Sequence, residues 1–174
     1  MANDEELMLA CAHGRGQALE ELFARYRQPI WAFFARRLRG GARAEELAQD
    51  VFVAVLKNAA RYTPEAPFRS YLFGIAFNVL AADRRRWAQH ASASLDTIEP
   101  EAQATDMDAG LWVRQALGKL SQDDREIVML REFEQLSYEE IADVLAVPVN
   151  TVRSRLFRAR MELKRCLNIP VRKT

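Results

Sequence analysis

Apolar residues recur at helical spacing along most of the chain, beginning with the segment ALEELFARYRQPIWAFFARRLRG. This spacing is typical of a helix with one buried face. The apolar positions of the segment are Leu19, Leu22, Phe23, Tyr26, Ile30, Phe33 and Phe34. Pro29 should bend or interrupt the helix, because proline lacks an amide hydrogen and its ring clashes with the preceding turn. Gly40 and Gly41 end the pattern and suit a C-cap.

Two further segments carry the same pattern, and a short helix is expected before them at the N-terminus. The segment AEELAQDVFVAVLKNAARY forms a stripe from Leu47, Val51, Val55 and Ala59. After a break at TPEAP, a third helix is expected from Phe68 to about Trp87. Its buried stripe is expected to be Leu72, Ile75 and Val79. These helices together predict one N-terminal bundle.

The composition changes after this bundle. Between Arg86 and Arg114 there is no Lys or Arg, whereas acidic residues stand among Ala, Ser and Thr. The acids are Asp96, Glu99, Glu101, Asp106 and Asp108. This composition is typical of a linker, so we expect an N-terminal domain over residues 1–90, an acidic linker over 91–110 and a C-terminal module over 111–174.

Three helices with clear start signals are expected in the C-terminal module. Ser121 caps a helix that runs to about Glu132, and the capping box Ser137–Glu140 opens the next. That short helix meets a break at Ala146-Val147-Pro148, and a longer helix begins near Val149. This is the helix-turn-helix arrangement, whose second helix enters the major groove of DNA. Ala146 stands where glycine is common, which matters little if the turn avoids positive φ.

The long final helix concentrates positive charge, although the formal net charge of the chain is only +1. Its basic residues are Arg153, Arg155, Arg158, Arg160, Lys164 and Arg165, opposed along the helix only by Glu162. At about 100° per residue, one face is apolar and must pack. That face consists of Val149, Val152, Leu156, Ala159, Leu163 and Cys166. The opposite face carries Asn150, Ser154, Phe157, Arg158, Met161 and Arg165.

A basic helix face is ordinarily just solvated, but Phe157 and Met161 favour a different interpretation. A solvated face gains nothing from two large apolar side chains, whereas a thymine methyl group offers them a contact. Arginine binds guanine O6 and N7 in bidentate fashion, and lysine neutralises phosphate. The sequence therefore predicts a DNA-binding surface on this helix.

Composition excludes several classes of protein. With 49% hydrophobic and 28% charged residues, the chain is typical of folded globular proteins. No apolar run reaches the roughly 20 residues that span a bilayer, so we expect a cytoplasmic protein without membrane insertion. Cys11 and Cys166 are then expected to be reduced. Cys11 and His13 are too few ligands for a metal site, no cofactor motif is present, and no catalytic motif indicates an enzyme.

The motifs in their order resemble the sigma-70 family, and most closely its small extracytoplasmic-function (ECF) sigma factors. They are AEELAQDVFVAVLKN, FRSYLFGIAFNVLAADRRR and LSQDDREIVMLREFEQLSYEEIADVLAVPVNTVRSRLFRAR. The resemblance implies an all-α fold: a region 2 bundle that binds core RNA polymerase and opens the −10 promoter element, and a region 4 helix-turn-helix that reads the −35 element. It also implies a linker that threads the polymerase and a cognate anti-sigma factor.

The resemblance further implies roles for individual residues. The polymerase-binding face, which would contact the β′ clamp helices, is Glu45, Glu46, Gln49 and Asp50; the β subunit is a further expected partner. The −10 candidates are Phe68 with the loop before it, Tyr71, Asn78, Arg84, Arg85 and Arg86. The −35 candidates are Asn150, Thr151, Arg153, Ser154, Arg155, Phe157, Arg158, Arg160 and Lys164.

Alternatives stay open at this point. The acidic face is also consistent with simple solvation, and the acidic segment with a plain spacer. Phe73 and Phe77 are more readily explained as core residues than as stacking surfaces. A stand-alone regulator with a LuxR-like helix-turn-helix would share the C-terminal pattern, and an adaptor that binds only proteins would share the helices.

Overall fold

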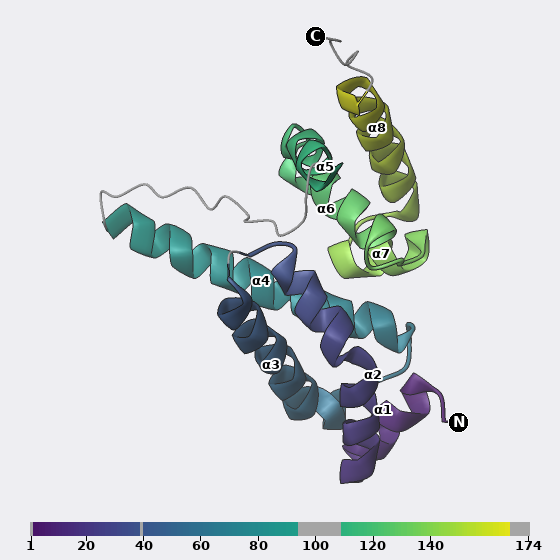
Figure 1. Cartoon of the computed structure of the whole chain (residues 1–174). Coiled ribbons are helices and arrows are strands. Elements are labelled where there is room, and N and C mark those ends of the chain that lie inside the picture. The colour runs from purple at the N-terminus through teal and green to yellow at the C-terminus, as the bar shows by residue number, and fades with distance from the viewer. Residues whose placement is uncertain (1, 39, 94–108, 168–174) are drawn as a thin grey trace. The chain divides into compact units, whose positions relative to one another are not determined.

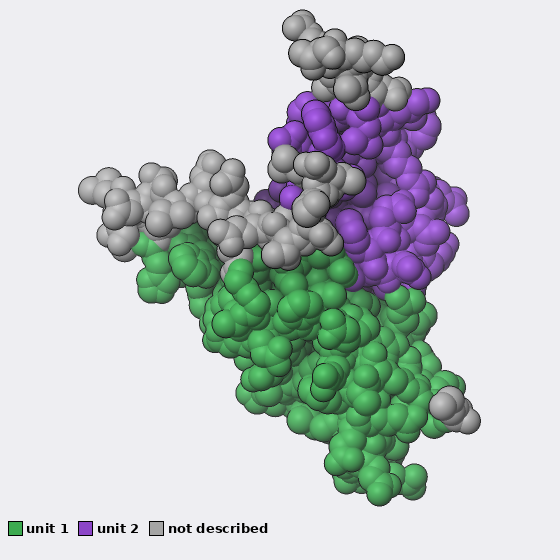
Figure 2. Space-filling model, viewed as in Figure 1, with its two compact units in different colours: residues 1–103 green, residues 104–174 purple. Residues whose placement is uncertain are grey.

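The computed structural model describes residues 2–38, 40–93 and 109–167. These residues form eight α-helices and one short 3-10 helix, without a strand among them (Figure 1). The expected all-α class is therefore confirmed. The chain divides into two compact units, residues 1–103 and 104–174 (Figure 2), each with its own buried core.

The N-terminal unit is built from four α-helices. These are α1 (Asp4–Ala12), α2 (Gly16–Ala35), α3 (Gly41–Asn58) and α4 (Phe68–Ala93), with the 3-10 helix η1 (Ala59–Arg61) following α3. Helix α2 packs against α1 and α3, and α3 packs against α4. The stripe expected on α3 is buried along its whole length, from Leu47 to Ala59. On α2, Leu22, Tyr26, Ile30, Phe33 and Phe34 are buried, whereas Phe23 is 41% exposed.

Of the bend or interruption expected at Pro29, the interruption is wrong, and so is the C-cap expected at Gly40 and Gly41. The helix is not interrupted at Pro29 but continues to Ala35, because proline removes one hydrogen bond while the buried residues beyond it still anchor the helix to the core. Gly40 does not cap this helix: Arg36 does, and Gly40 is the N-cap of α3 with φ of 89°. A backbone angle in that region favours glycine.

Helix α4 differs from expectation in its length and its buried face. It extends to Ala93 rather than to about Trp87. Its buried side chains include Leu72, Phe73, Ala76 and Leu80. Ile75 and Val79, which were expected inside, are only half-buried. The buried stripe is therefore rotated toward Phe73, which confirms that this phenylalanine is a core residue; Phe77 is half-buried.

The C-terminal unit contains one helix more than the sequence pattern predicts. Helix α5 (Ala109–Gly118) precedes α6 (Gln122–Glu132), α7 (Tyr138–Leu145) and α8 (Val149–Leu167). The side chain of Arg125 closes the end of α5, since its Nε donates to the Leu117 carbonyl at 2.9 Å. The expected domain limits at 90 and 110 thus fall inside α4 and α5, and the acidic segment between these helices lies outside the described residues.

The start signals of α6 and α7 are confirmed. The Ser121 hydroxyl accepts from the Asp124 amide at 3.2 Å. At α7, the Ser137 hydroxyl accepts from the Glu140 amide at 3.0 Å, and the Glu140 carboxylate accepts from the Ser137 amide at 2.7 Å. Reciprocal bonds of this kind satisfy two amides that a helix start otherwise leaves without partners.

Candidate nucleic-acid and protein interfaces

The turn between α7 and α8 has the helix-turn-helix form and contains a strained residue. Ala146 lies in the left-handed region, with φ of 51° and ψ of 46°. Its amide and that of Val147 bond back to carbonyls of α7, the latter to Ala142 at 3.0 Å. The turn therefore does not avoid positive φ. An alanine in this conformation costs about 1 kcal/mol relative to glycine.

Helix α8 buries the face that the sequence predicts. Val152, Leu156 and Ala159 are buried against the rest of the C-terminal unit. The remaining apolar positions of that face, Val149, Leu163 and Cys166, are half-buried. This packing, mainly on α6 and α7, fixes which side of α8 faces outward.

The opposite face of α8 is exposed along its length. It presents Asn150, Ser154, Phe157, Arg158, Met161 and Arg165. The Phe157 ring is 66% exposed, and Met161 is 39% exposed. Leaving such apolar area in water is unfavourable by about 25 cal/mol per Å². Two exposed apolar groups among arginines therefore suit a surface that a ligand covers.

Acids from α6 hold two of the cations on the flanks of α8. Arg155 pairs with Asp123 at 3.1 Å, and Arg160 donates to Glu132 at 2.8 Å. The hydrogen bond to Glu132 raises the pKa of Arg160. Counting acids along α8 alone, which left only Glu162, missed these partners because they are distant in sequence. The two guanidiniums are thereby given fixed orientations beside the exposed face.

The other basic and polar candidates on α8 are less constrained. Arg153 lies 3.5 Å from the Asn150 side-chain oxygen, and both side chains are exposed. Arg158 and Lys164 are exposed. Thr151 is half-buried, and its carbonyl accepts from the Ser154 hydroxyl at 3.1 Å. The structure thus places all nine C-terminal candidates on or beside one surface of α8.

The acidic candidates on α3 share an exposed face. Glu45, Glu46, Gln49 and Asp50 are all exposed, whereas Leu47 and Val51 next to them are buried. Glu46 accepts from Arg43 at 2.5 Å. The acidic groups of this face therefore stand on a rigid helix, where a basic partner can bind them.

Arg43 also reaches a buried carboxylate that sequence reasoning missed. It donates to Asp83 on α4, which is 1% exposed and stands directly before Arg84, Arg85 and Arg86. Arg86 lies 3.9 Å from the same carboxylate and is exposed, as is Arg85, while Arg84 is half-buried. In the sequence, the feature that could have indicated this buried acid is its position directly before three arginines.

Phe68 is not available to a ligand, which corrects its assignment as a DNA-contacting residue. Its ring is 1% exposed and packs against Tyr26, at 5.5 Å between ring centroids. The apolar ring is worth more to the fold inside the core than it would be on the surface. Its contribution to any site is therefore to support the residues around it.

Three of the remaining candidates of α4, Tyr71, Asn78 and Arg85, lie along one line of the helix. Tyr71 is half-buried, and Asn78 and Arg85 are exposed. Successive members of this trio are two turns apart, so at about 100° per residue they point the same way. The Tyr71 ring stacks edge-on against Tyr62 at 5.0 Å, and the hydroxyl oxygens of both tyrosines are buried without a hydrogen-bond partner among the described residues.

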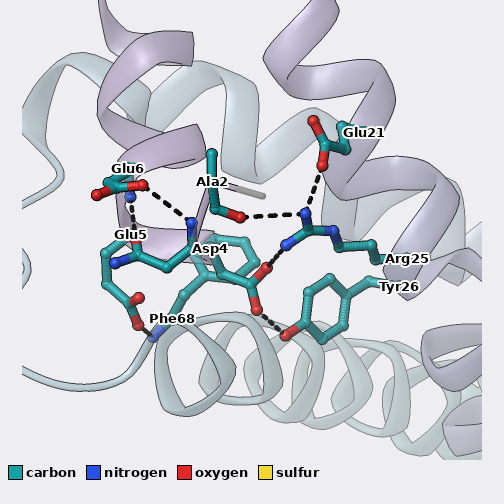
Figure 3. A network of polar contacts seen from close by, with 9 residues as sticks. Ala2, Asp4, Glu5, Glu6, Glu21, Arg25, Tyr26 and Phe68 are labelled. Carbon is teal, nitrogen blue, oxygen red and sulfur yellow. Dashed lines mark hydrogen bonds and ion pairs between the residues drawn. The ribbon is translucent and has the colours of Figure 1, made fainter.

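A polar network around α1 was also missed by sequence reasoning (Figure 3). Asp4 accepts from Tyr26 and from Arg25, the latter at 2.5 Å. Glu5 accepts from the backbone amide of Phe68 at 2.7 Å. These partners come from distant parts of the sequence, so no local pattern announces them.

Other kinds of site find no support in the part of the chain that the structure describes. No group of three or more His, Cys, Asp or Glu residues there has the geometry of a metal site. Cys11 and Cys166 are free thiols. Within the described ranges, no helix has the length and apolarity to cross a membrane.

Comparison with known proteins finds two family models in the chain. Residues 22–89 match sigma-70 region 2, and residues 110–163 match sigma-70 region 4. The two matches follow the division into a bundle and a helix-turn-helix module. The match to region 2 also disfavours a LuxR-like regulator, because such a protein would share only the C-terminal module.

Proteins with similar sequences match this chain over most of its length. RNA polymerase sigma factor YlaC of Bacillus subtilis is 32% identical, over 85% of this chain and 91% of its own. CarQ of Myxococcus xanthus is 35% identical, over 88% of this chain and 91% of its own. The ECF sigma factor SigC of Mycobacterium tuberculosis is 31% identical, over 91% and 90%.

Solved structures share the fold. CnrH, solved in complex with the cytosolic domain of CnrY, has a TM-score of 0.72 at 26% identity, covering 97% of this chain and 99% of its own. The sigma factor RpoE of Bartonella quintana, solved with the anti-sigma factor NepR, has a TM-score of 0.73 at 23% identity, covering 87% and 98%. With region 2 and region 4 in order and relatives that match nearly end to end, the chain belongs to the sigma-70 family and is an ECF RNA polymerase sigma factor.

Proposed function

We propose that this sigma factor works through three surfaces. One on the C-terminal unit and one on the N-terminal unit read the promoter, and a second surface on the N-terminal unit binds core polymerase. As an ECF sigma factor it binds core RNA polymerase and directs the start of transcription. The observation that carries the assignment is the exposed face of α8, where Phe157 lies among cations.

The face of α8 is proposed to read the −35 element in the major groove. Phe157 would contact a thymine methyl group, and Arg158 would bind a guanine edge. Lys164 and the flanking Arg155 and Arg160 would bind phosphates, the two arginines being oriented by Asp123 and Glu132. Near the start of the helix, the part that enters the groove most deeply, the further contacts would be made by Asn150, Thr151, Arg153 and Ser154.

The exposed acids of α3 are proposed to bind the polymerase. Glu45, Glu46, Gln49 and Asp50 offer carboxylates and an amide that suit a basic helical surface such as the β′ clamp helices. Contact with the β subunit is proposed as well. The rigidity of α3, with Leu47 and Val51 buried beneath, would limit the entropy lost on binding.

The line of Tyr71, Asn78 and Arg85 on α4 is proposed to bind the unpaired −10 strand. The half-buried Tyr71 ring would stack on a base, the Asn78 amide would hydrogen-bond to a base edge, and Arg85 would neutralise the phosphate backbone of the strand. Arg84 and Arg86 would add phosphate contacts. Phe68 supports this surface from inside and is not part of it.

Further partners and properties follow from the family. Sigma factors are not enzymes, and we propose that this chain has no catalytic activity and uses no cofactor of its own. It would act in the cytoplasm, where polymerase and promoters meet. A cognate anti-sigma factor is proposed: the similar sigma factor RpoE of Bartonella quintana was solved with the anti-sigma factor NepR, and CnrH was solved with the cytosolic domain of CnrY.

The test is transcription with purified components. The protein should co-purify with core polymerase in the absence of DNA, and the mixture should initiate from a defined set of promoters on genomic fragments. Core polymerase alone should not initiate at those promoters. A protein that binds duplex DNA but neither associates with core polymerase nor supports initiation would contradict the proposal.

A further inference from the structure

The first turn of α4 is capped by a residue of α1, which is far from α4 in the sequence. Glu5 on α1 accepts a hydrogen bond from the Phe68 backbone amide at 2.7 Å (Figure 3). Phe68 is the first residue of α4, where the amides have no partner within the helix. A carboxylate at this position also complements the positive end of the helix dipole.

The Glu5 carboxylate is held in place by a well-anchored helix. Neighbouring Asp4 accepts from the Tyr26 hydroxyl and from Arg25, and Arg25 also donates to the Ala2 carbonyl at 3.1 Å. A capping box between Asn3 and Glu6, with bonds of 2.7 and 3.0 Å, closes the start of α1. Burial of Leu7 and Met8 fixes α1 on the bundle. Glu5 is therefore a preorganised acceptor.

The capped turn carries the start of the proposed −10 surface. The Phe68 ring lies 6.3 Å from Tyr62 and 6.1 Å from Tyr71, between ring centroids. These three rings lie where the loop of residues 62–67 enters α4. If the first turn of α4 frays, Tyr71 loses its fixed position, and so does the loop before Phe68.

We propose that Glu5 is a positioning residue for −10 recognition. The inference rests on the proposed function of Tyr71 and Asn78. Glu5 touches no DNA. It holds the first turn of α4 in the geometry in which Tyr71 meets an unpaired base.

Three substitutions separate the hydrogen bond from the charge. Glu5→Gln keeps a side-chain oxygen that can accept from Phe68 but removes the charge. Glu5→Asp keeps the charge on a side chain one methylene shorter, which cannot reach the amide without moving α1. Glu5→Ala removes both. Loss of a carboxylate by itself should strengthen binding to DNA, because it removes a repulsion from phosphate, whereas loss of the brace should weaken it.

The measurement uses holoenzyme and a promoter that it selects in transcription, with the non-template −10 strand left unpaired. We expect Glu5→Ala and Glu5→Asp to bind this DNA about three- to tenfold more weakly, as loss of a helix cap predicts. Glu5→Gln should bind within about twofold of the natural protein or more tightly, as a retained acceptor with less charge predicts. Affinity for core polymerase should be the same in all three.

Several results would overturn the proposal. The first is that Glu5→Asp binds the unpaired −10 strand as tightly as the natural protein does. The second is that Glu5→Gln and Glu5→Ala lose the same amount of affinity for this DNA. The third is that the variants lose affinity for core polymerase as well, which would indicate general unfolding. If Glu5→Ala does not fold, the contrast of Glu5→Asp with Glu5→Gln decides. Asn78→Ala distinguishes the proposal for Glu5 from the proposed −10 surface on which it rests. If that variant binds the unpaired strand normally, the −10 surface is wrong; if it binds weakly while the Glu5 variants do not, only the role of Glu5 is wrong.

Discussion

Arg43 on α3 donates a hydrogen bond to the buried carboxylate of Asp83 on α4, joining two helices that carry different proposed surfaces. The two ends of this ion pair are not equivalent. The Arg43 side chain is 30% exposed and has a second partner in Glu46, whereas Asp83 is almost wholly buried. Hydrogen bonds to both acids raise the pKa of Arg43, Asp83 contributing most.

This asymmetry predicts unequal losses of stability. Arg43→Ala leaves a carboxylate in the core and should cost about 3–5 kcal/mol. Asp83→Ala should cost less, since Arg43 can turn toward Glu46 and water. Arg86→Ala, which removes an exposed cation 3.9 Å from Asp83, should cost no more than about 1 kcal/mol. Urea unfolding of the three variants checks this order, and equal losses for Arg43→Ala and Asp83→Ala would contradict it.

The exposed face of α8 predicts different roles for two of its cations. Arg158→Ala should cost about 1–3 kcal/mol on the preferred −35 sequence and relax selectivity, as loss of a bidentate base contact does. Lys164→Ala should weaken binding to all sequences equally and lower the salt dependence by about one phosphate contact. Holoenzyme binding to matched and mismatched −35 duplexes across a salt series measures both. Equal loss on matched and mismatched DNA in both variants would mean that α8 does not read sequence.

The acidic face of α3 predicts a separable polymerase contact. Replacing Glu46, Gln49 and Asp50 together by Ala should reduce affinity for core polymerase. The three side chains are exposed, so each change should alter stability by no more than about 0.5 kcal/mol. Glu20→Ala, an exposed acid on α2, is the control and should bind normally. A folded triple variant with unchanged core affinity would rule out this face.

The left-handed conformation of Ala146 predicts a stabilising substitution. Ala146→Gly should raise the free energy of unfolding by about 0.4–1 kcal/mol, because glycine adopts this φ without strain. Ala24→Gly, at an exposed position inside α2, should instead lower it by about 1 kcal/mol. Thermal unfolding of both variants tests the contrast. A loss of stability in Ala146→Gly would show that the turn is not strained.

The buried hydroxyl of Tyr62 predicts a pH-dependent effect. Burial raises the pKa of Tyr62 to about 12. Because the unfolded chain ionises near the ordinary tyrosine pKa of about 10, the contribution of Tyr62 to stability is complete below that pH. It is lost as the pH rises from about 10 to the folded value of about 12.

Tyr62→Phe removes both the ionisation and the buried hydroxyl oxygen. The variant should be more stable than the natural protein by about 1 kcal/mol at neutral pH, since that oxygen has no hydrogen-bond partner among the residues that the structure describes. The difference should widen above pH of about 10. Thermal unfolding at pH values from neutral to strongly alkaline measures it, and a constant difference would refute the assigned pKa shift.

The sequence predicted the features of the fold that depend on residues within a turn or two of one another, such as helix starts and buried helix faces. Helical spacing identified the buried stripe of α3, and the side chains of Ser121 and Ser137 marked the starts of α6 and α7 because a cap acts within one turn. The exposed face of α8 followed from its period. The resemblance to ECF sigma factors, which the comparisons confirm, came from the order of motifs.

What the sequence did not predict depends on contacts between distant segments. Phe68 is aromatic and precedes an apolar helix, but only packing against Tyr26 decides that it is buried. The acids that hold Arg155 and Arg160 come from α6, and the acid that caps α4 comes from α1. Helix α5 was missed because its start lies next to the acidic segment, whose composition suggested a linker.

The line of Tyr71, Asn78 and Arg85 sets a measure of length along α4. At 1.5 Å per residue, the two ends of the line are about 21 Å apart. Consecutive stacked nucleotides rise about 3.4 Å, so a strand lying along this line would extend over about six of them. Because α4 is one uninterrupted helix, this span cannot stretch or shorten to suit the DNA. The helix would therefore fix the distance between the base that Tyr71 contacts and the phosphate that Arg85 contacts. A promoter with a nucleotide inserted or deleted between these two points would have to bulge or lose one end of the contact.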